Sequence, residues 1–508
     1  MLKISGAKAS NIDRSSALYQ KIAAVNPRLA NKDSDIWGPA AKAEASIRLN
    51  WIDAPESSRE LLPQLDALSA KFRNHARVVL CGMGGSSLAP EVIAATYRKE
   101  LFVLDSTDPV YIHHALAGDL HQTVVVVGSK SGSTIETASQ RALFAEAFRT
   151  LGLNPVEHMV IVTDPGSPLD QSARADGYTV VNADPNVGGR FSALTAFGLV
   201  PAALIGVDPS LLLDAASDAK SQVIDSTIAV DIAYLIASAG QYLTYCDSVE
   251  IPGLSDWIEQ LVAESTGKNE VGRLPIVIES PTSAGAGEVM SIAFSGDADL
   301  VISGELGEQF FLWEWVTALV GAALEIDPFN QPNVTEAKEA TSALLSEWNG
   351  VLPEFTADAV DGAVEIFGVG SDLTAALRTF LDSIPAGGYV AVMAYLDRSG
   401  DRDLAKLREI IARKSQRPVT FGWGPRFLHS TGQFHKGGQQ NGAFLQITGI
   451  TNGDVVIPGQ KYGFKTLVMA QALGDLRALA KRKYPLLRLH LSDRSAGIAQ
   501  ILKAAEAL

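Results

Sequence analysis

Five polar side chains crowd the turn GSKSGSTIET at 128–137, directly after an apolar run. They are Ser129, Lys130, Ser131, Ser133 and Thr134. Ser133 and Glu136 have the spacing of a capping box, which predicts that a helix begins here. Hydroxyl and N–H groups at a helix N-terminus can hold a phosphate monoester through charge-assisted hydrogen bonds. Capping alone needs one hydroxyl group. The additional hydroxyl groups of this turn therefore predict a phosphate site.

A glycine-rich segment, GMGGSSLAPEV at 82–92, follows an earlier apolar run. Its glycines, among them Gly85, let the backbone approach a ligand closely, and Ser86 adds a hydroxyl. Backbone N–H groups at the start of the following helix would form an anion site. A tight strand-to-helix turn without a ligand is the equally open alternative. The segment lacks the GK[ST] of a Walker A loop and the context of a dinucleotide fingerprint, so a nucleotide site is not expected.

Glu264 has the features of a general base. The helical stretch DWIEQLVAES precedes Gly267, a suitable residue to end a helix. Glu264 is therefore predicted in the last turn, at the negative end of the helix dipole, where the protonated form of a carboxylate is favoured. A carboxylate of this kind can take up and return a proton. The alternative is a solvated glutamate on a helix surface.

Arg190 has the features of a fixed cation. It follows two glycines and is predicted to open a helix over 190–205. A guanidinium in this position can stabilise a developing oxyanion, and it keeps its charge while doing so. The alternative is a structural ion pair with Asp184.

Five short apolar runs predict the strands that position these residues. They are VVLCG (78–82), FVLDS (102–106), TVVVVGS (123–129), HMVIVTD (158–164) and YTVVNA (178–183). Runs of this kind mark strands that are buried on both faces. Because helical stretches separate them, they predict parallel βαβ units in a doubly wound α/β domain.

The rest of the chain predicts two further α/β regions. Strands are expected at 274–280, 299–305, 364–371 and 389–396, and helices at 221–245, 254–266, 307–325 and 333–348. The expected organisation is an N-terminal helical segment without strands over 1–75, a first α/β domain over 76–208, a second over 209–348 and a C-terminal α/β region over 349–508.

Composition limits the functions that this chain can have. The net charge of −15 argues against nucleic acid as a partner, and a phosphorylated substrate would need a locally basic or N–H-rich site. No apolar run approaches the roughly 18 residues that cross a bilayer, so no membrane partner is expected. Two cysteines and the lack of HxH or HExxH spacing predict no disulfide framework and no metal, in keeping with a cytoplasmic protein.

Five elements make the sequence resemble the glucose-6-phosphate isomerases of the SIS (sugar isomerase) fold. The two loops described above are similar to the paired loops of a SIS domain, and VGGRFS (187–192), ESTGK (264–268) and DPFNQPNVTEAK (327–338) resemble elements of the isomerases, in family order. The whole chain is most similar to the isomerase half of fused transaldolase–glucose-6-phosphate isomerase proteins. The resemblance implies flavodoxin-like, three-layer αβα SIS domains, an additional C-terminal α/β region and a functional link to a transaldolase.

The resemblance also implies an activity and a set of roles. The chain would interconvert glucose 6-phosphate and fructose 6-phosphate through a cis-enediolate, without a cofactor. Glu264 would move the proton between C1 and C2, and Arg190 would stabilise the enediolate. Gln331, predicted at a helix N-cap, would contact the phosphate, and Lys338 the ring oxygen, with a surface lysine as the alternative. The phosphate would also be held by Gly85, Ser86, Ser129, Lys130, Ser131 and Thr134.

The sequence departs from the family in the position of the histidine that opens the sugar ring. No histidine lies between 159 and 428, whereas LHSTGQ (428–433) resembles the element that carries it. We therefore expect the C-terminal region to fold back so that His429 supplies the acid, with His435 in reserve and Lys436 near the same pocket. The alternative is that both histidines pack or cap, while water or Lys338 opens the ring.

Two other functions stay open at this point. One is a SIS-fold isomerase of another phosphosugar. The other is a non-catalytic phosphosugar sensor, which would not need Glu264, Arg190 or Lys338. Family members usually form dimers that borrow an active-site residue from the partner. The late histidine leaves both a homodimer and a monomer open.

Overall fold

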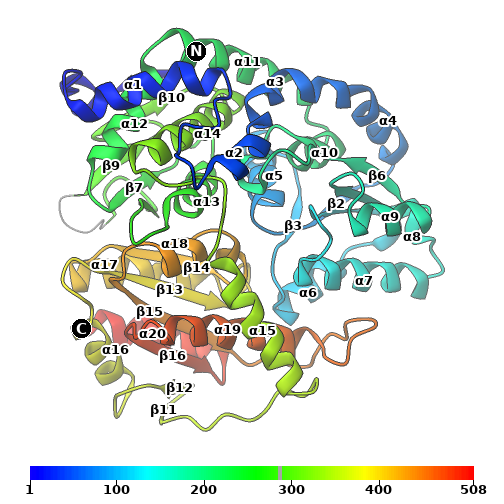
Figure 1. Ribbon diagram of the computed structural model, residues 1–508. Helices are drawn as coiled ribbons and strands as arrows, with labels where there is room; N and C mark the ends of the chain where they lie inside the picture. The colour runs from blue at the N-terminus through cyan, green and yellow to red at the C-terminus, as the bar shows by residue number, and fades with distance from the viewer. Residues whose placement is uncertain (284–288) are drawn as a thin grey trace.

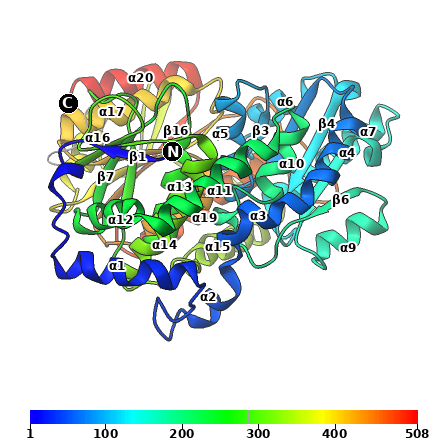
Figure 2. The same cartoon turned by 90° about the horizontal axis from the view of Figure 1, so that it is seen from above.

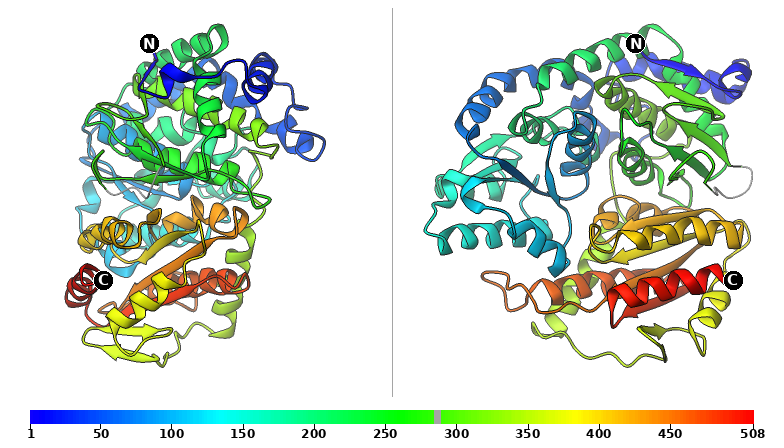
Figure 3. Two further views of the ribbon diagram at one scale, coloured as in Figure 1. Left: turned by 90° about the vertical axis from the view of Figure 1, so that its left-hand side faces the viewer. Right: turned by 180° about the vertical axis from the view of Figure 1, so that it is seen from behind.

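Three mainly parallel β-sheets surrounded by helices make up the computed structural model, which describes residues 1–283 and 289–508 (Figure 1). Each sheet with its helices forms one lobe. In Figure 1 the first lobe lies on the right, the second at the upper left and the third below, and the lobes meet near helix α13 (Leu254–Thr266). Seen from above, the first lobe stands beside the other two (Figure 2). The N-terminus lies in the second lobe and the C-terminus in the third (Figure 3).

The first sheet is parallel throughout. Its strands lie in the order β3 (Phe102–Leu104), β2 (Arg77–Gly82), β4 (Thr123–Gly128), β5 (Met159–Thr163) and β6 (Thr179–Asn182). All residues of β4 and β5 are buried, because their β-branched side chains pack on both faces of the sheet. Counted within this sheet, the order is 2-1-3-4-5, which is that of a flavodoxin-like doubly wound fold. The predicted fold class is confirmed.

The strand order has a consequence for ligand binding. In doubly wound sheets, ligands bind beyond the carboxyl ends of the strands, at the point where the order reverses. Here that point lies between the neighbouring strands β2 and β4. The glycine-rich segment follows β2 and leads into α5 (Leu88–Thr96), whereas the hydroxyl-rich turn follows β4 and leads into α7 (Ile135–Thr150). Both predicted loops therefore flank the same crevice.

The second sheet corrects two sequence predictions. Its order is β1 (Lys3–Ser5), β10 (Leu300–Ser303), β9 (Met290–Ala293), β7 (Tyr242–Cys246) and β8 (Leu274–Val277), with only β1 antiparallel. Residues 1–75 thus contain a strand, since β1 finds its partner almost 300 residues later in β10. The helix expected over 221–245 is three elements, namely the end of α11 (Pro209–Asp225), α12 (Ile228–Ser238) and β7. The β-branched and aromatic residues of YLTYC favour a strand over a continued helix.

The third sheet forms the C-terminal α/β region. Its order is β11 (Ala359–Asp361), β12 (Val364–Phe367), β16 (Leu486–Leu491), β15 (Gly442–Gly449), β13 (Tyr389–Tyr395) and β14 (Val419–Trp423). The four strands β13 to β16 are parallel. Strands β12 and β11 extend the sheet at one edge through two antiparallel pairings, β12 with β16 and β11 with β12. Helices α16 (Leu373–Asp382), α17 (Leu407–Ser415), α19 (Phe464–Ala480) and α20 (Arg494–Glu506) pack around this sheet.

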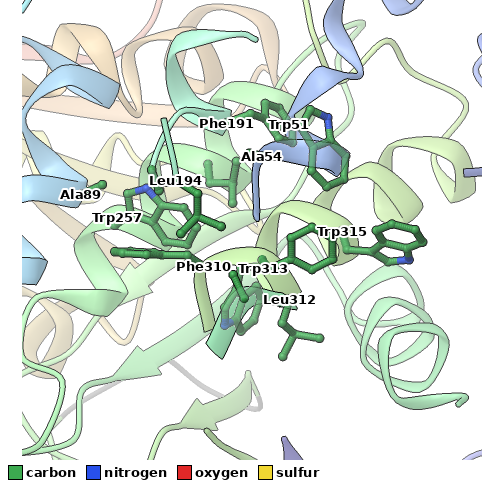
Figure 4. Close-up of a cluster of buried hydrophobic side chains, with 14 of the residues drawn as sticks. Trp51, Ala54, Ala89, Phe191, Leu194, Trp257, Phe310, Leu312, Trp313 and Trp315 are labelled. Carbon is green, nitrogen blue, oxygen red and sulfur yellow. The ribbon is translucent and has the colours of Figure 1, made fainter. Parts of the chain in front are cut away.

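Helix α14 (Leu306–Ala323) forms the centre of the second lobe and supports α13. Its residues from Leu306 to Ala322 are all buried, as expected for a helix that is apolar on every side. Figure 4 shows the aromatic cluster around it, in which Phe310 packs edge-on against Trp257 of α13, with ring centroids 4.8 Å apart. Phe191 packs against Trp51 in the same cluster. Within residues 1–283 and 289–508, no helix combines the length and apolarity needed to cross a membrane.

Glu314 is a buried carboxyl group in the middle of α14. Neither carboxyl oxygen has an ion-pair or side-chain hydrogen-bond partner among the described residues. Burial raises the pKa of Glu314 well above its usual value, and the Ala193 backbone opposes this shift. Above the usual carboxyl range the folded state keeps a proton that the unfolded state releases. The free energy of unfolding therefore falls as pH rises. We expect Glu314→Gln to remove this loss and to stabilise the protein by on the order of 1–3 kcal/mol at pH 8.

The measurement is the thermal unfolding midpoint of parent and variant at pH 5 and at pH 8. The variant's advantage should be larger at pH 8. Glu308→Gln is the control, because Glu308 sits on the same helix but is ion-paired with the N-terminus at 2.7 Å. An advantage that is equal at both pH values would contradict the assignment of a raised pKa to Glu314.

Candidate active site

The glycine-rich segment after β2 is pressed against the segment that carries Arg190. A Cβ atom added to Gly85 would lie 1.9 Å from the carbonyl oxygen of Gly189, so only glycine fits this contact. Gly84 has a φ of +55°, which also favours glycine. Ser86 lies half-buried at the carboxyl ends of β2 and β4, where its Cβ is 3.3 Å from a Cβ built on Gly128. The packing of Gly85 thus joins the first crevice loop to Arg190.

The hydroxyl-rich turn after β4 is organised differently from the predicted capping box. Thr134 is the N-cap residue of α7, and its side chain makes no capping bond, so the prediction of a Ser133 cap is wrong. Ser129 Oγ accepts a hydrogen bond from the Gly132 N–H, and Ser131 Oγ lies 2.6 Å from Ser133 Oγ. Ser133 and Thr134 line a cavity. The hydroxyls of Ser129, Ser131 and Ser133 thus bond within the turn, and none of the turn's hydroxyls caps the helix.

Lys130 is held away from that cavity. Its Nζ lies 2.9 Å from Oδ2 of Asp164 and donates to the carbonyl oxygen of Val187 at 2.8 Å. Burial lowers the pKa of the Lys130 ammonium, and the Asp164 carboxylate opposes this shift. Lys130 joins the turn to the neighbouring strand ends, where it fixes the position of the loop.

Glu264 lies in the last turn of α13, which ends at Gly267, as the sequence predicts. Its Oε1 atom lies 3.1 Å from Nη1 of Arg190, and its Oε2 atom accepts a hydrogen bond from Nε2 of Gln260 at 3.1 Å. The side chain is only 12% exposed, so it is not the solvated surface glutamate of the alternative. The carboxylate is thus held on both oxygens, and neither Glu264 nor Arg190 is among the residues that line the cavity of Ser133 and Thr134.

Arg190 is fixed by four further hydrogen bonds. It donates to Ser265 Oγ at 2.8 Å, to Gln331 Oε1 at 3.0 Å and to the carbonyl oxygens of Pro328 and Asn330 at 2.7 and 3.0 Å. Burial lowers the pKa of Arg190, and Glu264 opposes that shift. A guanidinium stays charged at neutral pH even when burial lowers its pKa in this way. The structure thus holds a desolvated cation in one orientation beside Glu264.

Two predictions about the surroundings of Arg190 are wrong. Asp184 is not its partner, because the Asp184 carboxylate accepts from Asn50 Nδ2 at 2.9 Å. The helix expected over 190–205 starts later, since a 3-10 turn at Gly189–Phe191 precedes α10 (Ala196–Leu204). The Ser192 and Thr195 hydroxyls donate to backbone carbonyls three residues earlier, which competes with helix formation here.

Gln331 and Lys338 come from the segment that enters α15 (Val334–Glu347). Gln331 precedes the N-cap, because Asn333 takes that position and donates its N–H to Gln433 of the third lobe at 2.9 Å. The predicted N-cap at Gln331 is therefore wrong, although its side chain reaches Arg190. Lys338 is exposed and lines the same cavity as Ser133 and Thr134.

His429 reaches this cavity from the third lobe of the same chain. It ends a 3-10 turn at Arg426–His429 and lines the cavity. Its Nε2 atom lies 3.0 Å from Oε1 of Glu136, and its backbone carbonyl accepts from Gln260 Nε2 at 2.8 Å. Gln260 therefore connects the histidine turn to the Glu264 carboxylate. The C-terminal region does fold back onto the loops of the first lobe.

Glu136 orients His429. Glu136 is buried at the start of α7 and also accepts a hydrogen bond from Gln471 Nε2 at 2.7 Å. Burial opposes its charge, but the His429 charge and hydrogen bond outweigh burial and hold the pKa of the Glu136 carboxyl below its usual value. The Nδ1 atom of His429 has no hydrogen-bond partner among the described residues. It is the ring nitrogen that is free to meet a ligand.

His435 and Lys436 occupy the helix α18 (Gly432–Gly437), which follows His429. His435 is buried and does not line the cavity, and its Nδ1 lies 2.9 Å from the Tyr389 hydroxyl. Burial lowers the pKa of His435 to about 3, so the imidazole is neutral. Lys436 lines the cavity, and its ammonium pairs with buried Asp475 at 2.5 Å.

Sequence reasoning missed three residues of this site, namely Glu136, Gln260 and Gln471. Gln260 lies one turn before Glu264 on α13, which is a signal that could have placed it near the base. The sequence indicated only a capping role for Glu136. Gln471 lies 335 positions later in the chain, so no local pattern connects it with Glu136. Among residues 1–283 and 289–508, no group of three His, Cys, Asp or Glu side chains could hold a metal ion.

The order of the strands and the two crevice loops define a structural class, the doubly wound SIS fold. A solved structure that is similar to this one is a glucose-6-phosphate isomerase from Chlamydia trachomatis, with a TM-score of 0.50, 20% identity, and coverage of 61% of this chain and 75% of that one. At this identity the likeness shows the fold alone.

The sequence comparisons show a similarity to one family over part of the chain. Residues 66–266 match the family model described as phosphoglucose isomerase. Over 222 residues the chain is 30% identical to a probable glucose-6-phosphate isomerase of Haloquadratum walsbyi (41% of this chain, 51% of the relative), and over 212 residues 34% identical to one of Haloarcula marismortui (39% and 48%). The chain thus spans about half the length of these curated relatives. The matched region is similar to the phosphoglucose isomerase family, and it makes up less than half of this chain.

Proposed function

We propose that this chain is a glucose-6-phosphate isomerase, an aldose–ketose isomerase that interconverts glucose 6-phosphate and fructose 6-phosphate through a cis-enediolate. The observation that carries the proposal is the contact between Glu264 and Arg190 at 3.1 Å, linked through Gln260 to the histidine turn. A proton carrier and a fixed cation beside an anion-binding turn are the set of groups that this reaction requires.

The phosphate would lie against the hydroxyl-rich turn at the start of α7. Ser133 and Thr134 already line the cavity, and the positive end of the helix dipole favours an anion there. Ser129, Ser131, Ser86 and the backbone at Gly85 would complete the phosphate site, with Lys130 holding the turn and Gln331 approaching beside Arg190. Lys338 lines the cavity and forms no ion pair among the described residues, so its charge is available to the substrate's ring oxygen.

Ring opening needs an acid that protonates the ring oxygen while a hydroxyl proton leaves. His429 is suited to this step, because Glu136 accepts its Nε2–H and stabilises the imidazolium. His429 lines the cavity, and the proton on Nδ1 would then be the one that is donated to the ring oxygen. Glu136 acts on the substrate only through His429, so it is a positioning residue.

Isomerisation follows on the open chain. The Glu264 carboxylate would take the proton from C2 of the aldose and return it to C1, while the hydroxyl proton passes from O2 to O1. This gives the ketose, and the reverse reaction uses the same path. The negative charge that develops on the enediolate oxygen would be stabilised by the Arg190 guanidinium. Because Arg190 is already oriented and desolvated, this stabilisation needs no reorganisation during the reaction.

His429→Ala should separate ring opening from proton transfer. We expect kcat on fructose 6-phosphate, which is mainly cyclic, to fall by about 10²-fold or more. The acyclic analogue 5-deoxyfructose 6-phosphate cannot close its ring, so its turnover should change by less than about fivefold. Product formation is followed by NMR for both substrates. His121→Ala, at an exposed position, is the control. Equal losses on both substrates would remove the ring-opening role from His429.

The function itself is tested by a coupled assay of purified protein with fructose 6-phosphate, in which the glucose 6-phosphate formed is oxidised by a dehydrogenase. Parallel reactions with mannose 6-phosphate separate this activity from that of another phosphosugar isomerase. Turnover of fructose 6-phosphate at least tenfold faster than that of mannose 6-phosphate supports the proposal. Binding of sugar phosphate without any turnover would favour a sensor instead.

The contact between His429 and Glu136 within one chain supports a site that needs no residue from a partner subunit. A monomer would then be active, and a homodimer would have two independent sites. Phosphorylated hexoses are metabolites of the cytoplasm, where we place this protein. The functional link to a transaldolase stays a prediction.

A further inference from the structure

A second cavity lies where the three lobes meet, two turns before Glu264 on α13. Its walls come from α5 of the first lobe, α13 of the second and, from the third, β14 with the turn that ends at His429. The charged and aromatic side chains that line it include Glu91, Asp256, Glu259, Arg398, Trp423 and Arg426. None of these residues belongs to the isomerase machinery described above.

The two arginines of this cavity are already neutralised. Arg398 donates to Oε1 of Glu91 at 2.6 Å, and Arg426 donates to Oε2 of the same carboxylate and to Asp105 at 2.8 Å. Two guanidinium groups thus face two carboxylates. The remaining carboxyl groups, Asp256 and Glu259, add negative charge to the cavity when they are deprotonated, so an anionic ligand is disfavoured.

Glu259 is the unusual member of this group. It is only 9% exposed and lines the cavity, yet it has no hydrogen bond or ion pair with any described residue. A buried carboxylate without a partner is costly. Burial raises the pKa of Glu259 well above its usual value, and Arg426 opposes the shift. Asp256 is exposed toward the cavity, and its pKa is raised by desolvation and by the nearby carboxylates of Asp247 and Glu91. Neither Asp256 nor Glu259 forms an ion pair with a described residue, and Arg426 acts on both only at longer range.

We propose that this cavity binds a small organic ammonium ion, whose charge is taken by Asp256 and Glu259 and whose apolar body packs against Trp423 and Phe421. The two aromatic rings stand edge to face, 4.9 Å apart, and both line the cavity. Aromatic faces attract ammonium groups, which adds to the attraction of the carboxylates. A divalent metal ion is a poorer fit, because the carboxyl groups of the described residues form no three-ligand cluster here.

The pH dependence follows from the groups that face the cavity. The other titratable residues keep their charge between pH 6 and pH 8: the arginines hold the pKa of Glu91 at about 2 against burial, burial raises that of Tyr111 to about 12, and Arg398 and Arg426 stay protonated. Only Asp256 and Glu259 release protons on binding. The affinity for an ammonium ion should therefore rise with pH over this range.

The test is calorimetric titration of the purified chain with benzylamine at pH 6 and pH 8. We expect tighter binding at pH 8, and at least tenfold weaker binding of benzyl alcohol, which has the same shape without the charge. Glu259→Gln and Asp256→Asn should each weaken benzylamine binding at least tenfold. Glu250→Gln, at an exposed position outside the cavity, should bind as the parent does.

Turnover of fructose 6-phosphate by each variant reports whether its fold is intact, and the comparison with benzyl alcohol needs no variant. Three results would overturn the proposal: no benzylamine binding at pH 8 up to 50 mM, equal affinity for the alcohol, or unchanged affinity in both carboxyl variants. The proposal does not rest on the isomerase activity. A parent protein that binds benzylamine but turns over no sugar phosphate would reject the proposed function alone.

Discussion

Glu264→Gln should lose turnover of fructose 6-phosphate by about 10³-fold or more, while its fold and its affinity for the sugar phosphate remain. The amide has the shape of the carboxylate, but it cannot take a proton from C1 or C2. Its side-chain oxygen can still accept the Gln260 hydrogen bond that now holds Oε2 at 3.1 Å. The loss should appear in kcat. It is measured with the coupled assay, and deuterium uptake at C2 from heavy water is followed by NMR.

A matched control lies on the same helix. Glu259→Gln makes the same chemical change five residues earlier, at a group that does not face the substrate site, so kcat should stay within about twofold of the parent. Affinity for the non-reacting analogue sorbitol 6-phosphate separates binding from chemistry in all three proteins. Turnover above a tenth of the parent value in Glu264→Gln would exclude this carboxylate as the proton carrier.

Arg190→Lys should lower kcat by roughly 10²- to 10³-fold, although the positive charge is kept. Lysine cannot reproduce the planar fork that contacts Glu264 at 3.1 Å and donates to Gln331, Pro328 and Asn330. The charge would therefore no longer be fixed beside the enediolate oxygen. Two backbone carbonyls also lose their donors, at a cost to the free energy of unfolding of about 1–3 kcal/mol.

The catalytic and structural effects of this change can be measured separately. Rates are compared well below the thermal midpoint of each protein, so that partial unfolding does not enter kcat. Arg48→Lys is the control, because Arg48 pairs with Glu44 and with the Pro185 carbonyl, outside the site. If Arg190→Lys kept kcat within fivefold of the parent, oxyanion stabilisation by this guanidinium would be wrong.

The sequence predicted the parts of the site that have a local signal. The end of α13 at Gly267 placed Glu264, and the buried β-branched runs placed the two loops at the ends of β2 and β4. The resemblance of LHSTGQ to a family element led to His429, which the structure brings to the same cavity as the hydroxyl turn.

What the sequence could not supply depends on contacts between distant segments. The hydrogen bond between Gln260 and the His429 carbonyl joins residues 169 positions apart, and no periodic pattern in the sequence predicts such a contact. Lys130 looked like a phosphate ligand, but its direction is set by Asp164 on a neighbouring strand end. Strand β7 follows α12 within one continuous apolar stretch, so the pattern does not show where the helix ends and the strand begins. The three residues of β1 form a strand only because they pair with β10.

The position of His429 in the third lobe has a consequence for protein synthesis. In the proposed mechanism, a chain still being made carries its proton carrier and its guanidinium by residue 264, but the acid proposed to open the ring is not translated until residue 429. Fragments released early would thus be unable to consume cyclic substrate, however well their first two lobes had folded. Turnover of cyclic substrate would therefore begin only when the third lobe has folded and contacts the first lobe.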